Sequence, residues 1–187
     1  MNALRTYALD IAAFIWGVAE ATLFFIVPDV LLSYIGLKRG SKDAARASVI
    51  AAIGAGVGGA IMFVWSTRDP AAAQHAVQAL PAISETMSAR AATAMSEQGW
   101  FWATFWGPLS STPYKVFAVL APHADAPLAG FAAASVIARL PRFLAVSVGV
   151  ALIGQGLRRW LSERQLLWLL VGAWVLFYAV FFALMPN

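Results

Sequence analysis

The chain of 187 residues contains no cysteine and only two histidines, and charged residues make up just 12% of it. Without cysteine, neither a disulfide framework nor a metal site built on thiolates is possible. A soluble domain of this size needs about twice that charge density to cover its surface. Long basic runs and basic residues interleaved with aromatic ones are also missing, so the sequence does not indicate nucleic-acid binding.

Hydrophobic residues, in contrast, make up 61% of the chain, and three continuous apolar segments cover residues 45–65, 127–154 and 165–185. At 1.5 Å per helical residue, about 20 residues cross the hydrocarbon layer of a bilayer. We therefore expect an all-α integral membrane protein, a single membrane domain with about three transmembrane helices at these positions. Trp174 and Tyr178 lie too deep in the last segment to be simple anchors at the membrane interface.

Two further apolar segments, residues 7–37 and 99–121, are interrupted by proline. Proline removes a backbone donor and clashes with the preceding turn, so each segment should break into two half-helices and form a re-entrant hairpin. The first segment contains acidic residues and is too long for the core of a secretory signal, so we expect it in the mature protein. The breaks are predicted at Pro28-Asp29, at Gly107-Pro108 and at Pro113.

The charges between the segments predict how the chain is oriented. Residues 38–46 and 157–164 are rich in lysine and arginine, whereas residues 67–98 are not, so the two basic loops should be cytoplasmic and the 67–98 connection external. With that orientation, residues 99–121 must return to the side from which they started. The polar and apolar residues of 67–98 predict an amphipathic surface helix, kinked at Pro81, that lies on the membrane.

Six ionisable residues fall within the apolar segments. A charge at the centre of a bilayer costs roughly 2.5–3.5 kcal/mol on insertion scales, so these side chains should point inward and pair with one another. Three are acidic and three are basic, which suits a shared polar cavity. They are Asp10, Glu20, Asp29, Lys115, Arg139 and Arg142.

Arg139 and Arg142 are three residues apart, and Ser135 lies one helical turn earlier, so all three should line one stripe of a helix. Two guanidinium groups on one face suit a phosphate, which each of them can bind through two hydrogen bonds. The alternative is that the arginines only neutralise Glu20 and Asp29 within a buried scaffold. The two interpretations are compatible.

The remaining charged residues also have alternative roles. Glu20 is either a proton carrier, because desolvation disfavours its charged form, or the permanent partner of an arginine. Asp29 follows the breaking proline and either only caps the half-helix that starts at Val30 or takes part in transport. Lys115, at the second break, either meets an anionic headgroup or extends to water.

No enzyme, cofactor or metal site is expected. Ser110, Ser111 and Thr112 lack the nucleophile-elbow setting and any nearby histidine. His75 and His123 are isolated in loops, so a metal site is not predicted.

Three stretches together resemble the DedA (VTT-domain) family of membrane proteins, in its short YqaA-like branch. The stretch from Glu20 to Asp29 (EATLFFIVPD) resembles the first hairpin of that family, although Asp29 stands where the family often has glutamate. The stretch from Gly107 to Phe117 (GPLSSTPYKVF) resembles the second hairpin, and Ala138 to Leu144 (ARLPRFL) resembles the arginine-bearing helix that follows. The resemblance implies two inverted re-entrant hairpins that meet at the membrane midplane, and the transport or scrambling of lipids such as polyprenyl phosphates.

The resulting hypothesis is a multi-pass translocator of a phosphate-bearing lipid in a bacterial inner membrane. Arg139, Arg142 and Lys115 would hold the phosphate headgroup, while Glu20 and Asp29 would exchange protons or alternate as their partners. Membrane lipids are then the expected partners. Two alternatives are a transporter of small ions or solutes and a structural partner in membrane assembly. A small-residue face in residues 45–65 would serve a homodimer or internal packing equally well.

Overall fold

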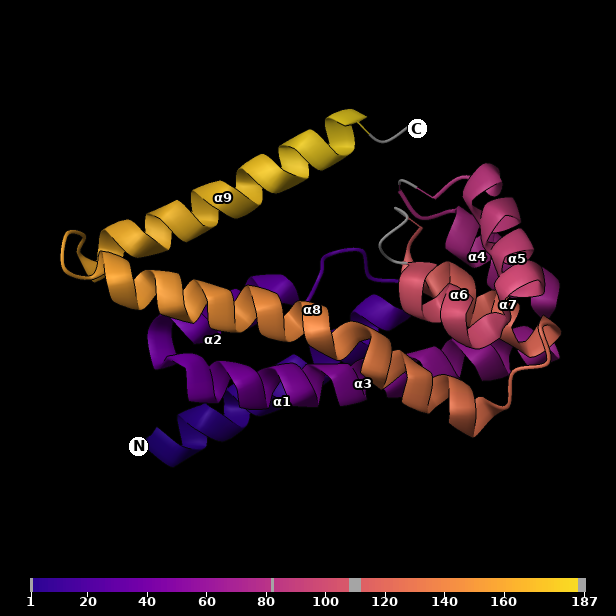
Figure 1. Ribbon diagram of the computed structural model, residues 1–187, viewed down its shortest axis with the longest axis horizontal. Coiled ribbons are helices and arrows are strands. Elements are labelled where there is room, and N and C mark those ends of the chain that lie inside the picture. Colours follow the sequence, from indigo (N-terminus) through magenta and orange to yellow (C-terminus); the bar gives the residue numbers. More distant parts are fainter. Residues whose placement is uncertain (1, 82, 108–111, 185–187) are drawn as a thin grey trace.

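The computed structural model describes residues 2–81, 83–107 and 112–184, with side chains from residue 7 onward, and it confirms the all-helical prediction (Figure 1). Throughout these residues the regular structure is helical, and no strand is formed. The elements, in chain order, are α1 (Asn2–Ala21), α2 (Asp29–Arg39), α3 (Ser41–Arg68), α4 (Pro70–Gln78), α5 (Glu85–Gln98), α6 (Trp100–Trp106), α7 (Tyr114–Leu120), the 3₁₀-helix η2 (Ala121–His123), α8 (Leu128–Leu157) and α9 (Glu163–Leu184).

Among the described residues, three helices are long and apolar enough to cross a membrane. They are α3, α8 and α9, and they include the three continuous apolar segments of the sequence apart from two residues. Pro127 immediately precedes α8, and residue 185 lies outside the described part. In α8 the helix continues through Pro141 without a break. By length and composition, these three helices are compatible with membrane spans.

The two interrupted segments are broken near the prolines. The first break covers residues 22–28, where α1 has ended and α2 has not begun; within it, the carbonyl of Ile26 accepts a hydrogen bond of 2.9 Å from the Trp16 indole. The second break lies between Trp106 and Tyr114, and Pro113 immediately precedes α7. Pro108, Ser110 and Ser111 lie outside the described residues.

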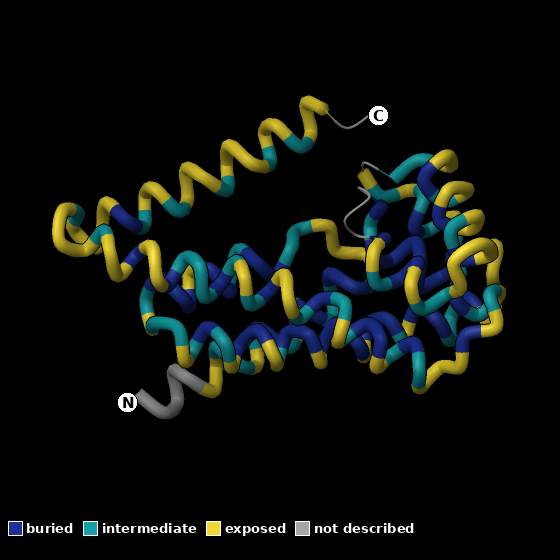
Figure 2. Tube along the Cα trace, in the orientation of Figure 1, coloured by how far each residue is buried: buried dark blue, intermediate teal, exposed yellow. Residues whose placement is uncertain are grey.

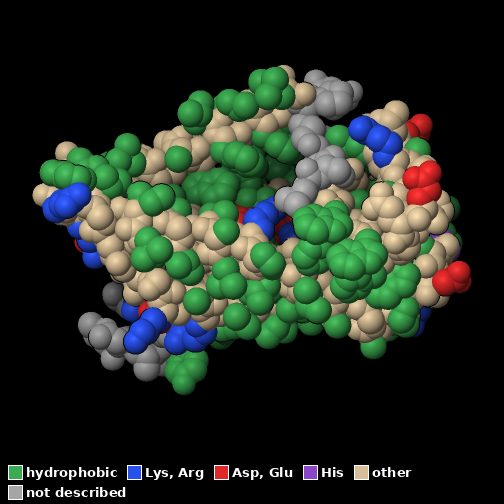
Figure 3. All heavy atoms as spheres, viewed as in Figure 1, with side chains coloured by type: hydrophobic (Ala, Val, Ile, Leu, Met, Phe, Trp, Pro, Cys, Tyr) green, Lys and Arg blue, Asp and Glu red, His purple; other side chains and the backbone are tan. Residues whose placement is uncertain are grey.

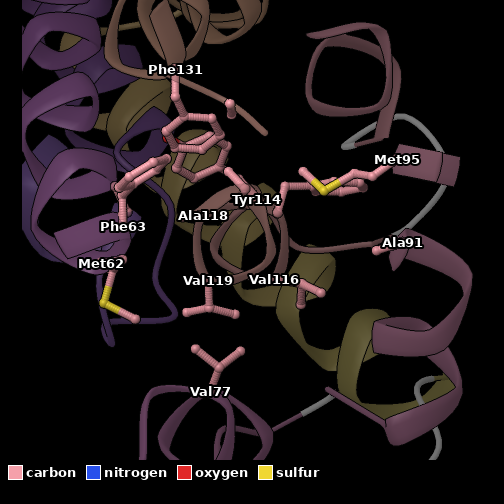
Figure 4. Packing of buried hydrophobic residues seen from close by; sticks show 14 of the residues in the cluster. Met62, Phe63, Val77, Ala91, Met95, Tyr114, Val116, Ala118, Val119 and Phe131 are labelled. Atoms are coloured by element: carbon pink, nitrogen blue, oxygen red, sulfur yellow. The ribbon is translucent and has the colours of Figure 1, made fainter. Parts of the chain in front are cut away.

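The connection over residues 67–98 differs from the prediction of one kinked surface helix. It forms two helices, α4 and α5, whose apolar residues Val77, Met87 and Ala91 are buried in the protein interior. Val77 and Ala91 belong to one hydrophobic cluster with Val116 and Val119 of α7, and Figure 4 shows Val77 opposite Val119. The apolar face of this connection therefore packs against the apolar residues of α7.

Small residues let α1, α3 and α8 approach one another closely. A methyl group added to Gly54 or Gly58 of α3 would overlap the carbonyl oxygen of Phe14 or of Val18 in α1. On another side of α3, Gly56 contacts Ala132 and Val136 of α8 in the same way. The small-residue face of α3 is therefore used for packing within the chain, which is one of the two roles expected for it.

Burial is uneven across the molecule. Figure 2 shows buried residues along α3 and the helices that surround it, whereas α9 is exposed over most of its length. Leu166 is the buried residue of α9 over its described length. Figure 1 shows α9 diverging from α8 after the turn at residues 158–162.

Candidate functional site

The two arginines of α8 are only three residues apart but have different surroundings. Both project from a helix that stays regular through Pro141, which keeps them three residues apart on adjoining faces. The side chain of Arg139 is 5% exposed, whereas that of Arg142 is 43% exposed. One guanidinium group is therefore enclosed by protein, and the other is open to a ligand.

Arg139 forms an ion pair with Glu20, the residue before the last of α1. Its Nη2 donates to Oε2 of the carboxylate, and both side chains are nearly inaccessible. The guanidinium carbon also lies 4.7 Å from the centre of the Tyr114 ring and 5.4 Å from that of Phe143. A buried charge needs such partners, because water is not there to solvate it.

Tyr114 is itself held in place by Ser135, the third residue of the predicted stripe. The Ser135 hydroxyl donates to the carbonyl of Phe131 at 2.7 Å, one turn earlier in α8. It is therefore free to accept the hydrogen bond from the Tyr114 hydroxyl. Ser135 thus orients the ring under Arg139 and does not face a ligand.

Arg142 forms the second ion pair, with Asp29 at the first position of α2. Its Nη2 lies 2.5 Å from Oδ2 of a carboxylate that is almost fully buried. The predicted cap is wrong, because the helix starts at Asp29 itself, Pro28 occupies the N-cap position and no side chain caps the helix. The side chain turns towards Arg142 instead, where a full charge replaces the weaker backbone donor.

Lys115 connects the two breaks. Its ammonium group donates a hydrogen bond of 2.7 Å to the carbonyl oxygen of Phe24, in the first break, and the residue is only 3% exposed. The suggestion that Lys115 extends to water is therefore wrong. A non-helical carbonyl has no backbone partner of its own, so a lysine donor from α7 satisfies it.

Asp10 lies apart from these groups. Its carboxylate is 3.3 Å from the guanidinium of Arg46, which also approaches Asp43 at 3.5 Å in the first turns of α3. The structure thus brings Glu20, Asp29, Arg139 and Arg142 into two neighbouring pairs joined through α8, and it leaves Asp10 outside them.

Two buried polar atoms in the described part of the chain have no hydrogen-bond partner: Oδ1 of Asp29 and Nε of Arg139. One is an acceptor and the other a donor, and each belongs to a different ion pair. Most buried polar groups in proteins are paired, so the two atoms give this site unused hydrogen-bonding capacity.

A cavity of about 480 Å³ opens beside the second ion pair, between α2, α8 and α9. Asp29 and Arg142 are its charged residues, and all the other lining side chains are apolar or aromatic. Figure 3 shows the hollow between α8 and α9, with acidic and basic side chains on its floor. The apolar walls are formed mainly by Val27, Val146, Val150, Leu170, Trp174 and Phe177.

A second cavity, of about 610 Å³, lies on the other flank of α9, against α1 and α2. Its lining is apolar and aromatic, and it shares Leu170 and Trp174 with the first cavity. These two residues therefore form a ridge of α9 that separates the two cavities.

Sequence reasoning missed the contacts that α9 makes with α2 and with the break before α2. The Trp174 indole donates a hydrogen bond of 3.0 Å to the Ser33 hydroxyl, and the Tyr178 hydroxyl accepts one of 2.9 Å from the amide of Val27. The sequence did contain a signal for these contacts, because Trp174 and Tyr178 carry polar groups deep in an apolar segment. Such groups need a hydrogen-bond partner when they are buried.

No group of three His, Asp or Glu side chains within the described residues could hold a metal ion. Comparisons with family models, with curated proteins and with solved structures find no match to this chain. The resemblance to DedA proteins therefore stays a prediction made from the three stretches that carry it.

Proposed function

We propose that the chain translocates a phosphate-bearing lipid between the two leaflets of a membrane, and that Arg142 receives the phosphate. The observation that carries this proposal is the half-exposed Arg142 in a cavity whose other walls are almost entirely apolar. A soluble anion would find little there besides the charge. An amphiphile with an anionic headgroup matches both the arginine and the walls.

Phosphate fits the arginine better than other anionic groups do. The guanidinium fork has five donors, and its ion pair with Asp29 is made by Nη2 alone. Donors therefore remain for two phosphate oxygens at once. The charge of Asp29 keeps the pair neutral while the site is empty, and a phosphate competes with that carboxylate when the lipid arrives.

Arg139 and Glu20 have a supporting role in this proposal. Both are buried, and Arg139 is held by a carboxylate and two aromatic rings. They fix α1 against α8 at the level of the site. Lys115 likewise fixes the first break against α7. Of the acidic residues, Asp29 is then the one that alternates between partners during transport.

Translocation also needs a route through the bilayer. We propose that the two broken segments enter the membrane from opposite sides as re-entrant hairpins and meet where Lys115 binds Phe24. Non-helical backbone is tolerated at membrane depth only where protein buries it or a wet cavity adjoins it. The charge of the loops and the resemblance to DedA proteins support this arrangement in a bacterial inner membrane.

The test is transbilayer movement of a labelled polyprenyl phosphate in liposomes that contain the purified protein, beside a labelled lipid with a neutral headgroup. The decisive variant is Asp29→Asn/Arg142→Gln, which removes both charges and leaves neither unpaired in the interior. We expect it to abolish movement of the phosphate lipid. Arg159→Ala, in the exposed turn after α8, is the matched control and should move lipid at the wild-type rate.

Each other outcome has a distinct meaning. Wild-type movement in the double variant would show that Arg142 does not receive the phosphate. Equal movement of both lipids by the wild-type protein would indicate a non-selective scramblase. Movement of neither lipid by correctly folded protein would favour a solute transporter or a structural membrane partner.

A further inference from the structure

The attachment of α9 to the rest of the protein is uneven along its length. At its start, the carboxylate of Glu163 lies 2.7 Å from the ammonium group of Lys38. In the adjoining turn, Arg158 donates a hydrogen bond to the carbonyl of Leu37. These contacts fix the beginning of α9 to the end of α2.

Further along α9, two side-chain hydrogen bonds hold the helix against the first hairpin. They are the bonds from Trp174 to Ser33 and from the Val27 amide to Tyr178. Leu166 is the buried residue of the described part of α9, and beyond the two hydrogen bonds the ring of Phe182 contacts that of Phe25, with their centres 5.8 Å apart. We call these two hydrogen bonds the latch.

The latch is next to the charged site. Val27, which donates to Tyr178, and Trp174 line the same cavity as Asp29 and Arg142. The Leu170–Trp174 ridge separates this cavity from the larger apolar one. If the ridge moved away, the two cavities would merge, and Arg142 would open sideways towards whatever surrounds α9.

The outer face of α9 shows what surrounds it. Trp168, Leu169 and Leu176 are 66%, 55% and 65% exposed, so an apolar medium must cover them. A helix long and apolar enough to span a bilayer meets lipid chains there. The bilayer beside the latch therefore contains the lipid that is the proposed substrate.

We propose that α9 is a lateral gate: it pivots about the turn at residues 158–162, the latch breaks, and a phosphate-bearing lipid passes sideways from the bilayer to Arg142. Trp174 and Tyr178 are positioning residues that hold the gate shut. This inference rests on the proposed function and names the path that the lipid takes to the site.

The first experiment measures opening without measuring transport. The chain has no cysteine, so Val146→Cys places a single thiol on the α8 wall of the charged cavity. Its rate of modification by a maleimide dissolved in the bilayer reports how often the gate is open. Tyr178→Phe removes the hydroxyl group and keeps the ring. Trp174→Phe, made separately, removes the indole N–H and replaces the indole with a smaller phenyl ring.

The thiol should be modified about threefold faster in each of these variants. This factor corresponds to ~0.6 kcal/mol, the average for a side-chain hydrogen bond in a membrane protein. Trp168→Phe makes the same change on the outer face of α9 and should leave the rate unchanged. Equal rates in the Trp174, Tyr178 and Trp168 variants would overturn the gate, whatever the protein transports.

The second experiment locks the gate. Tyr34→Cys on α2 and Val171→Cys on α9 both face the larger cavity, and both native side chains are accessible. A reducible two-headed thiol reagent should join them and reduce lipid movement in proportion to the cross-linked fraction, and reduction should restore it. Each single-cysteine variant, treated alike, is the control.

The outcomes separate this proposal from the one on which it rests. Undiminished lipid movement in fully cross-linked protein would overturn the gate and leave translocation intact. Threefold faster thiol modification in the latch variants, in a protein that moves no lipid, would support the gate and reject the proposed function.

Discussion

The two flanks of α8 each carry an arginine, and one of these arginines is buried whereas the other is half-exposed. On the inner flank, Arg139 is enclosed with Glu20, and the hydroxyl groups of Ser147 and Ser48 join α8 to α3 at 2.8 Å. On the outer flank, Arg142 faces a cavity and the loosely held α9. A position three residues further along one helix separates an arginine that holds the fold together from one that can bind a ligand.

The reason for the difference lies in what packs against each flank. The inner flank meets α3, whose small residues bring the backbones close and exclude water. The outer flank meets α9 across a hollow, so the charge of Arg142 stays accessible. The charge of Arg142 is accessible because the close packing around α8 ends on that side, although Arg139, three residues earlier, is enclosed.

The largest effect is expected from breaking the inner pair on one side only. Arg139→Met leaves Glu20 buried without its partner and should lower the free energy of unfolding by ~3–5 kcal/mol, measured by denaturation in detergent micelles. The double variant Glu20→Leu/Arg139→Met removes both charges and should unfold close to the wild type. Equal losses in the single and double variants would show that the ion pair is not what Arg139 contributes.

A smaller loss is expected from the close packing behind the inner flank. Gly54→Ala places a methyl group against the carbonyl oxygen of Phe14 and should destabilise the protein by ~1–3 kcal/mol. Gly149→Ala is the matched control in α8, because nothing lies within 4 Å of the added methyl group. It should raise the stability by up to ~1 kcal/mol, since alanine favours a helix. The stability of both variants is measured by thermal unfolding. An equal change in their unfolding temperatures would contradict the close packing at Gly54.

The outer pair should tolerate a change that keeps its charge. In Arg142→Lys, the loss in unfolding free energy should not exceed ~1 kcal/mol, because lysine keeps the positive charge that pairs with the buried carboxylate of Asp29. Movement of the phosphate lipid should nevertheless fall, because lysine lacks the guanidinium fork. A variant that loses stability but keeps its transport rate would reverse the roles assigned to the two flanks.

The smallest effect concerns the contact between the two breaks. Lys115→Met removes the hydrogen bond to Phe24 and should raise hydrogen exchange in residues 22–28 by roughly fivefold, the factor that ~1 kcal/mol corresponds to. Lys42→Met, at an exposed position in the first turn of α3, should leave exchange in residues 22–28 unchanged. The same exchange rate in both variants would mean that Lys115 does not hold the first break in place.

Local patterns in the sequence predicted the elements well. The length of each apolar run indicated α3, α8 and α9, and the backbone chemistry of proline indicated the breaks before α2 and before α7. Both the apolar runs and the prolines determine the backbone structure of the residues that contain or adjoin them. Tertiary contacts are not needed to interpret them.

The pairing of charges could not be predicted in the same way. The partners of Arg139 and Arg142 lie 119 and 113 residues earlier, and which acid meets which arginine depends on how α1 and α2 are rotated against α8. The cap expected of Asp29 failed for this reason, because a distant charge outcompeted a local backbone donor. The surface helix expected over residues 67–98 failed because α7 supplied an apolar partner that no local pattern reveals.

The distance along the chain between these partners has a consequence for how the protein is made. Glu20 and Asp29 belong to its first elements, whereas both arginines that neutralise them belong to α8. A ribosome makes the acids first, at about 5–20 residues per second, so they wait several seconds for their partners. The first broken segment therefore cannot neutralise its two acids by these ion pairs until α8 has been synthesised.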